Sequence, residues 1–177
     1  MSGRYGRRAR RAPRGYGAAQ MRPITDELSA VERQALEDIA EYGVHIVHVP
    51  DSDSGPGFSF TIGLWHQFGQ PEVIAFGLPE EVAHELLNAI ADEADDGRTF
   101  RDGEKHDELL VGYPVRFVAV PPDARASYFG LAEWAYAGEP FECVQLVWPD
   151  KQGRWPWDDA VRDGFRTGQP VLGRQAP

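Results

Sequence analysis

Two apolar runs separated by a very short connection constrain this chain more than any other part of its sequence. Across residues 58–64 the large apolar side chains fall on every second position, which is typical of a β-strand with one face in the core. Residues 72–78 form a second apolar run, and only residues 65–71 separate the two. Parallel strands need a crossover of a dozen or more residues, so these two strands should pair antiparallel. The core face of the first strand is predicted to carry Phe58, Phe60, Ile62 and Leu64.

Capping and stop signals place two helices around these strands. Ser29 and Glu32 form a capping box, and Gly43 is a good left-handed stop for the helix that they open. Pro79 opens a second helix, which should end at Gly97. Helical spacing predicts two buried stripes: Val31, Ala35, Ile39 and Tyr42 in the first helix, and Val82, Leu86 and Ile90 in the second.

Together these signals predict a single α+β domain over residues 23–177, with about five mostly antiparallel strands and about three helices. The strands are expected at residues 44–49, 58–64, 72–78, 114–120 and 141–148, the third helix at 123–137, and a further short helix is an option at 158–166. The polar residues 98–107 and the segment 65–71 should be loops. No internal repeat or interior linker divides this region.

The charge of the chain is divided unevenly between two segments. Residues 1–22 hold seven arginines and no acidic residue. Removing those seven from the 18 basic residues leaves 11 against 28 acidic ones, so residues 23–177 carry a net charge of −17. The sequence therefore describes an Arg-rich tail followed by an acidic domain.

The tail combines arginine with glycine, alanine and two tyrosines, a composition that cannot bury enough apolar surface to order itself, so we expect disorder. Its paired arginines resemble a twin-arginine export signal, but no apolar stretch follows them. Three interpretations stay open. The tail binds nucleic acid through phosphates and stacking, it docks onto its own acidic domain, or the true start is Met21 and the tail is a misassigned extension.

Composition narrows the class of protein. With 177 residues and a hydrophobic fraction of 42%, the chain suits a globular domain. No apolar run approaches the ~20 residues that a membrane helix needs, so no membrane partner is expected. The single cysteine, Cys143, excludes an internal disulfide and predicts a reducing, cytoplasmic location.

Several separated motifs resemble one bacterial family. They are Gly57-Phe-Ser-Phe-Thr-Ile-Gly-Leu64, Pro71-Glu-Val-Ile-Ala-Phe-Gly-Leu78, Gly112-Tyr-Pro-Val-Arg-Phe117, Gln145-Leu-Val-Trp-Pro-Asp150 and Gly153-Arg-Trp-Pro-Trp157. In this order they resemble the family known as domain of unknown function 4262, over roughly residues 43–157. The resemblance implies no particular activity or cofactor. The family often has His-Pro-Glu where this chain has Gln70-Pro71-Glu72, so a role for a histidine there does not carry over.

The segment from Trp65 to Glu72 is the most suggestive for chemistry. It places an imidazole, two aromatic rings, an amide and a carboxylate where two strands meet, and functional groups often collect in such loops. If the domain is an enzyme, His66 would transfer the proton, Glu72 would orient it or share protons, and Arg116 would hold an anionic group. The alternatives are a structural hairpin loop, and an Arg116 that pairs with an acid.

Three tryptophans in ten residues mark a second candidate region, which is either a rigid lid on the core or a stacking surface. We expect a ligand pocket between this region and residues 65–72. Its predicted lining is Trp65, Gln70, Trp148, Asp150 and Trp157.

The remaining histidines and the cysteine give no site. His45 and His48 are three apart on a strand and point to opposite faces, so they cannot chelate one ion, and no metal site is predicted. We expect one of them packed and the other exposed, with His84 and His106 at the surface. Cys143 has mostly apolar strand neighbours and should be a small buried hydrophobe rather than a nucleophile.

The function itself is unknown from the sequence, and two classes remain. The first is a small-molecule-binding or enzymatic domain, with no cofactor specified. The second is an acidic interaction module, similar to an immunity protein or antitoxin, which would bind a basic protein through residues 92–96 and 158–159. Nucleic acid would bind only through the tail, because the domain repels phosphate. The oligomeric state is open.

Overall fold

The computed structural model describes residues 20–173, so the predictions for residues 1–19 of the tail lie outside the described range. Ordered contacts begin before Pro23, the predicted first residue of the domain. The backbone N–H of Arg22 donates to Ala135 O at 2.9 Å, and its Nε donates to Trp134 O at 2.7 Å. Met21 packs against the core. No helix in residues 20–173 is both long and apolar enough to cross a bilayer.

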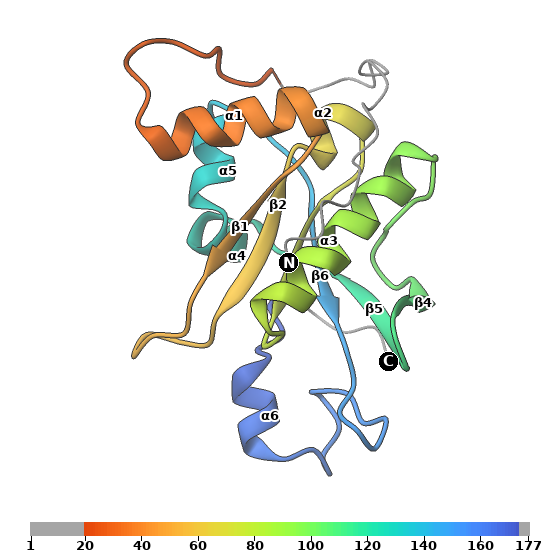
Figure 1. Cartoon of the computed structure of the whole chain (residues 1–177). Helices are drawn as coiled ribbons and strands as arrows, with labels where there is room; N and C mark the ends of the chain where they lie inside the picture. The colour runs from red at the N-terminus through yellow and green to blue at the C-terminus, as the bar shows by residue number, and fades with distance from the viewer. Residues whose placement is uncertain (1–19, 174–177) are drawn as a thin grey trace, which may run out of the picture.

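One mixed sheet organises the fold (Figure 1). Its strands follow the spatial order β1-β2-β3-β6-β5-β4, and only β3 and β6 pair in parallel. The strands are β1 (His45–Val49), β2 (Phe58–Ile62), β3 (Glu72–Phe76), β4 (Lys105–Leu110), β5 (Tyr113–Ala119) and β6 (Cys143–Val147). The predicted antiparallel pairing of β2 with β3 is confirmed. The chain returns in parallel at β6 only after a long excursion through α3, β4, β5, α4 and α5.

The helices are α1 (Ala30–Tyr42), α2 (Leu64–Phe68), α3 (Glu80–Asp95), α4 (Pro122–Tyr128), α5 (Gly130–Ala135) and α6 (Asp163–Gly168). The α+β class is confirmed, but residues 20–173 hold six strands and six helices rather than five and three. The helix predicted at 123–137 is broken at Phe129, whose backbone leaves the helical region (φ −106°, ψ 36°). Its fully buried ring packs against Phe60, with ring centroids 5.1 Å apart.

Two elements overlap the segments that the sequence predicts as loops, residues 98–107 and 65–71, because their signals are weak. β4 is an edge strand with a polar, largely exposed sequence, so it lacks the apolar alternation that marks a strand. α2 is a single short turn of helix that starts directly after Gly63. Leu64 therefore belongs to α2 and not to the strand, and it packs on the opposite side of the sheet from Phe60 and Ile62. The predicted face of four residues is correct only for its first three.

Helices cover both faces of the sheet and give it two cores. One core lies between the sheet and α1, α4 and α5; its sheet residues include Phe60, Ile62, Ile74 and Phe76. The other lies under α3; its sheet residues include Val73, Ala75, Phe117 and Leu146. Adjacent residues of β3 thus point into different cores, as the two-residue period of a strand requires.

The capping signals of α1 are confirmed, but its buried stripe matches the predicted one only in part. The Glu32 N–H donates to the Ser29 hydroxyl at 3.3 Å, the Glu32 carboxylate accepts from the Ser29 N–H at 2.8 Å, and Gly43 has φ 80°. Ala35, Leu36 and Ile39 are buried, whereas Val31 is 64% exposed. The helix is rotated toward Leu36, which removes Val31 from the contact face. Val82 of α3 is likewise exposed.

Gly63 joins β2 to α2 at a place where no side chain fits. Its φ is 121°, and a Cβ would lie 2.6 Å from Gly43 O. We expect Gly63→Ala to lower the free energy of unfolding by about 2–4 kcal/mol through backbone strain and steric overlap. The matched control is Gly97→Ala, which has φ 95° but no atom within 4 Å of the new Cβ. Both variants carry the cost of a positive φ, but only Gly63→Ala adds the steric overlap with Gly43, so denaturant titration of both separates these two costs. Equal losses of stability would show that the close approach to Gly43 is unimportant.

Candidate functional site

The parallel pair β3–β6 gives the sheet two distinct ends. At one end, where both strands begin, Glu72 pairs with Cys143; we call this the Glu72 end. At the other, both strands finish and Trp148 follows β6; we call this the Trp148 end. Arg116 pairs with Val147 and therefore lies near the Trp148 end. The structure thus places residues 65–72 and the tryptophan region at opposite ends of the sheet and does not bring them together.

The Glu72 carboxylate is completely buried at its end of the sheet. Its Oε1 accepts hydrogen bonds from the N–H groups of Gly63 and Trp65 at 2.9 and 3.1 Å, and from the Tyr136 hydroxyl. Its Oε2 accepts from the Thr61 hydroxyl at 2.6 Å. That hydroxyl also accepts from the Val73 N–H at 2.9 Å, which fixes its proton toward the carboxylate.

The burial of this carboxylate has electrostatic consequences. Burial raises the pKa of Glu72 above its usual value, while its four donors oppose the rise. Burial and the adjacent Glu72 charge hold the pKa of Tyr136 well above its usual value, so this hydroxyl stays a donor. Every contact of the carboxylate is with the protein, and none of its surface reaches solvent. Glu72 therefore acts here as a structural hydrogen-bond acceptor.

The other candidates at the Glu72 end lie in the framework around this carboxylate. The buried Gln70 accepts the Phe100 N–H through its side-chain oxygen at 3.3 Å, and Trp65 packs against the core under α1. His66 is partly exposed on α2, and its backbone N–H donates to the Tyr136 hydroxyl at 3.4 Å. The geometry gives Gln70 and Trp65 structural contacts, while proton transfer by His66 stays a prediction.

Arg116 makes an aromatic contact in place of the expected ion pair. No Asp or Glu in residues 20–173 lies within 4 Å of its guanidinium, and within the same range its buried Nε has no hydrogen-bond partner. The guanidinium lies over the Trp155 ring, 5.3 Å from its centroid. Trp155 stacks in turn on Trp157 at 5.3 Å with an interplanar angle of 3°. The three side chains form a layered cation–π stack.

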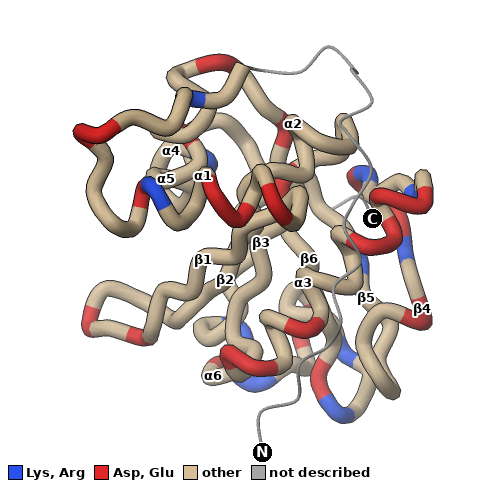
Figure 2. The backbone as a smooth tube through the Cα atoms, turned by 45° about the horizontal axis from the view of Figure 1, so that its top comes forward, with Lys and Arg blue, Asp and Glu red and all other residues tan. Residues whose placement is uncertain are grey.

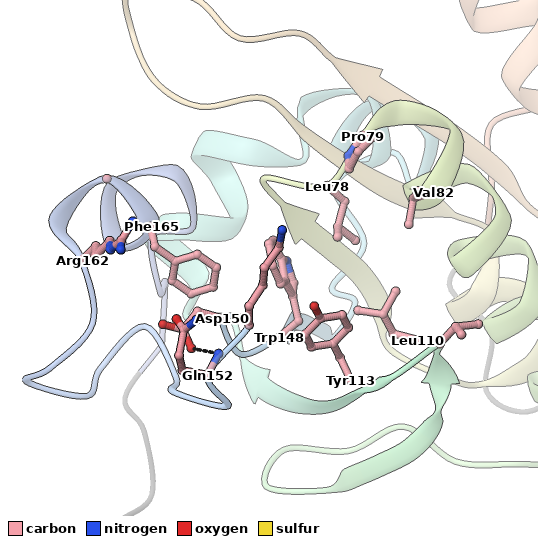
Figure 3. Close-up of a pocket in the computed structure, with 13 residues that line it drawn as sticks. Leu78, Pro79, Val82, Leu110, Tyr113, Trp148, Asp150, Gln152, Arg162 and Phe165 are labelled. Atoms are coloured by element: carbon pink, nitrogen blue, oxygen red, sulfur yellow. Dashed lines mark hydrogen bonds between the residues drawn. The ribbon is translucent and has the colours of Figure 1, made fainter.

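A pocket of about 760 Å³ opens at the Trp148 end (Figure 3). Its apolar walls come from the turn after β3, the start of α3, the β4–β5 hairpin and α6. The residues that supply these walls are Leu78, Pro79, Val82, Leu110, Val111, Tyr113, Trp148 and Phe165. Of the five predicted pocket residues, Trp148 and Asp150 line it, while Trp65, Gln70 and Trp157 do not.

Trp148 is a rigid wall of this pocket. Its Nε1–H donates to Phe76 O at 3.1 Å, and the edge of its ring meets Phe165 with centroids 5.0 Å apart. Gln169 bonds the backbone of Trp148 at both the N–H and the carbonyl, at 2.9 Å each. A residue held through both its ring and its backbone loses little further freedom when a ligand packs against it.

Asp150 shapes the rim of the pocket. Its Oδ1 accepts from the N–H groups of Gln152 and Arg154 at 2.8 and 2.9 Å, and Arg154 Nε donates to its Oδ2 at 2.7 Å. The hydrogen bond from Arg154 lowers the pKa of Asp150, so this carboxylate is ionised at neutral pH. Arg154 therefore neutralises the charge of Asp150, and this carboxylate is not free to bind a ligand.

Two cations at the rim have no such partner. Lys151 and Arg162 both line the pocket and are exposed. Across residues 20–173, no carboxylate lies within 4 Å of either side chain. The rim therefore presents two unpaired positive charges on an otherwise acidic domain.

The comparisons with known proteins identify a family. A profile described as "Domain of unknown function (DUF4262)" matches residues 38–162. The chain belongs to the DUF4262 family. The match confirms the resemblance seen in the sequence and spans all six strands of the described sheet. No curated protein and no solved structure matches this chain.

In this DUF4262 chain the remaining histidines are less exposed than predicted. His45 and His48 do lie on opposite faces: His45 Nδ1 contacts Asp38 of α1 at 2.7 Å, and His48 contacts α3. Neither is exposed. His84 is partly buried, because its ring meets His48 rather than solvent. His106 is 8% exposed and lies between Phe100 and Phe117, so the prediction of a surface position is wrong for both.

Cys143 is buried as predicted. Burial raises the pKa of its thiol, and the nearby Glu72 charge adds to the rise. A thiol that stays protonated is a poor nucleophile. The DUF4262 chain therefore uses this cysteine as a core residue.

Sequence reasoning missed Tyr113, Phe165, Lys151 and Arg162 of the pocket. Their common property is position: they surround the carboxyl ends of two strands that pair in parallel. The sequence offered no signal for that pairing, since β3 and β6 are separated by about seventy residues. The aromatic run after residue 148 was the one available pointer.

Removing one donor from Glu72 tests the buried network. We expect Tyr136→Phe to lower the free energy of unfolding by about 1.5–3 kcal/mol, because it deletes a buried hydrogen bond to a charged group. Tyr128→Phe is the matched control, since Tyr128 packs its ring against Phe58 and Phe76 and its hydroxyl has no hydrogen bond within residues 20–173. Chemical denaturation of both should show a loss for Tyr136 alone.

The raised pKa of Glu72 predicts a pH dependence with a definite sign. The folded protein holds this proton more tightly than the unfolded chain, where the usual value is 4.5. The stability advantage of wild type over Glu72→Gln should therefore fall as the pH rises from about 4 through the folded pKa, and then level off. Unfolding curves of both proteins across this range measure it. If the stability advantage of wild type instead grew with pH, the four hydrogen-bond donors would lower the folded pKa of Glu72 more than burial raises it.

Proposed function

We propose that this chain is a small-molecule-binding domain whose ligand occupies the pocket at the Trp148 end. The observation that carries the proposal is the combination of a pocket of about 760 Å³, aromatic walls and two unpaired cations at its rim. Ligand sites typically have volumes of roughly 300–1,000 Å³, apolar linings and a few polar groups that fix orientation. In open sheets they form beyond the carboxyl ends of parallel strands, which is where this pocket lies.

The lining supports a particular class of ligand. Trp148, Tyr113 and Phe165 offer flat apolar surfaces, which suit a planar, largely apolar molecule. Lys151 and Arg162 favour an anionic group on that molecule, such as a carboxylate, sulfonate or phosphate. The net charge of −17 in residues 23–177 weakens this attraction, so the apolar contacts should supply most of the affinity.

Binding is better supported than a reaction at this pocket. Among its lining residues the one carboxylate, Asp150, is occupied by Arg154 and held ionised. The lining therefore supplies no histidine and no free carboxylate, the groups that general acid–base catalysis uses most often. The sequence-based site of His66 and Glu72 lies at the other end of the sheet.

An acidic interaction surface has less support. Figure 2 shows Asp and Glu residues distributed over many elements rather than gathered on one face. In the two predicted clusters, Glu93 pairs with Arg98 at 2.7 Å, and Asp158 accepts the Trp155 N–H at 2.7 Å. Such contacts are typical of a solvated surface with local ion pairs.

A fluorescent probe with the proposed chemistry tests the pocket. 1-Anilinonaphthalene-8-sulfonate is an aromatic sulfonate with a planar naphthalene ring, and we expect it to bind the folded full-length chain at one site. Val82→Trp should abolish binding because it fills the pocket from an exposed position on α3. Val31→Trp places the same bulk on the exposed face of α1 and should leave binding unchanged.

The two cations are tested with the same titration. Arg162→Gln and Lys151→Gln should each raise the Kd by roughly two- to fivefold, the range for exposed charge pairs. Lys105→Gln removes the same charge from a strand outside the pocket and serves as the control. Equal binding by wild type and Val82→Trp would refute the proposal. An effect of Lys105→Gln equal to those of Lys151→Gln and Arg162→Gln would show that these two cations act only through the net charge of the protein and not as part of the site.

A further inference from the structure

Two histidines from distant parts of the sequence meet on the α3 face of the sheet. His48 lies on β1 and His84 on α3, and His48 Nε2 is 3.2 Å from His84 Nδ1. Their ring centroids are 5.4 Å apart at an interplanar angle of 38°. Both side chains are partly buried. Two ring nitrogens thus face each other at a place where solvent ions have access.

The His48 ring is oriented by a second contact on its other nitrogen. His48 Nδ1 lies 2.7 Å from the Ser59 hydroxyl, and Ser59 is only 5% exposed. When Nδ1 donates its proton to Ser59, Nε2 carries a lone pair that points at His84. Metal-binding histidines are held in this way, with one nitrogen on the metal and the other hydrogen-bonded to the protein.

The distance between the two nitrogens fits a shared metal ion. Zinc binds histidine nitrogen at about 2.0–2.1 Å in tetrahedral geometry, which separates neighbouring ligands by about 3.3 Å. Imidazole is also a favoured ligand for copper and nickel. We propose that His48 Nε2 and His84 Nδ1 together bind a divalent transition-metal ion of this group.

Further ligands for a modest, open site would come from α3 and from solvent. Glu80 lies four residues before His84 on α3, hence on the same side of the helix. In residues 20–173 no three His, Cys, Asp or Glu side chains already gather around a common point. Glu80, after a change of rotamer, and water would complete the coordination.

This inference is independent of the pocket at the Trp148 end, none of whose lining residues belongs to it. It also goes beyond the sequence, where only His45 and His48 suggested a metal. That pair cannot chelate, because its two side chains lie on opposite faces of the sheet. The neighbour of His48 is His84, 36 residues away on a helix.

Calorimetric titration of the folded full-length chain with Zn²⁺ tests the proposal, and the absorption spectrum of the Co²⁺ form reports tetrahedral coordination. We expect one site, and a loss of affinity of at least about tenfold in His48→Gln and in His84→Asn. Ser59→Ala, which removes only the orienting contact, should weaken binding by a similar factor. His45→Gln is the control, because His45 lies on the opposite face against Asp38.

Circular dichroism checks that each variant is folded. Glu80→Gln is a milder variant at an exposed helical position, and we expect it to lose less Zn²⁺ affinity than the histidine variants. Zn²⁺ binding that is unchanged in both His48→Gln and His84→Asn would overturn the proposal. A wild-type protein that binds no Zn²⁺ would also overturn the proposal, because the contact between the two rings would then be only a hydrogen bond.

Discussion

The buried carboxylate of Glu72 joins three segments of the chain: residues 61–65, the start of β3, and the residue that follows α5. It receives hydrogen bonds from Thr61 on β2, from backbone N–H groups at Gly63 and Trp65, and from Tyr136 just after α5. A carboxylate without these donors could not be buried at tolerable cost, and the donors without it would be unsatisfied. Each group thus requires the others, and this mutual requirement fixes the turn into α2 and the position of α5 against the sheet.

A comparable arrangement of amides fixes the C-terminal segment toward the Trp148 end of the sheet. Gln145, fully buried on β6, donates to Pro170 O and accepts from the Leu172 N–H, each at 2.8 Å. Gln169 bonds both backbone groups of Trp148. These bonds hold the chain beside α6 and thereby place Phe165 against Trp148. The wall of the pocket therefore depends on two buried glutamines that never touch its interior.

The two functional proposals share a physical origin. The pocket forms where β3 and β6 end together, and the histidine pair forms where α3 crosses β1 and β2. Both combine residues brought together by long-range packing, while the residues nearest in sequence contribute structural contacts. Glu72 illustrates the contrast, since its position in an aromatic, polar segment suggested catalysis but its environment makes it an internal acceptor.

Local physics determined much of this protein from the sequence alone. The alternation of apolar residues in β2, the apolar run of β3, the capping box at Ser29 and the stop at Gly43 act over a few residues and predicted their elements correctly. The α+β class and the burial of Cys143 followed in the same way. The tertiary structure decided the parallel pairing of β3 with β6, the polar edge strand β4, the rotation of α1 away from Val31 and the meeting of His48 with His84. These features depend on contacts between segments tens of residues apart, whose energies leave no periodic or local signal in the sequence.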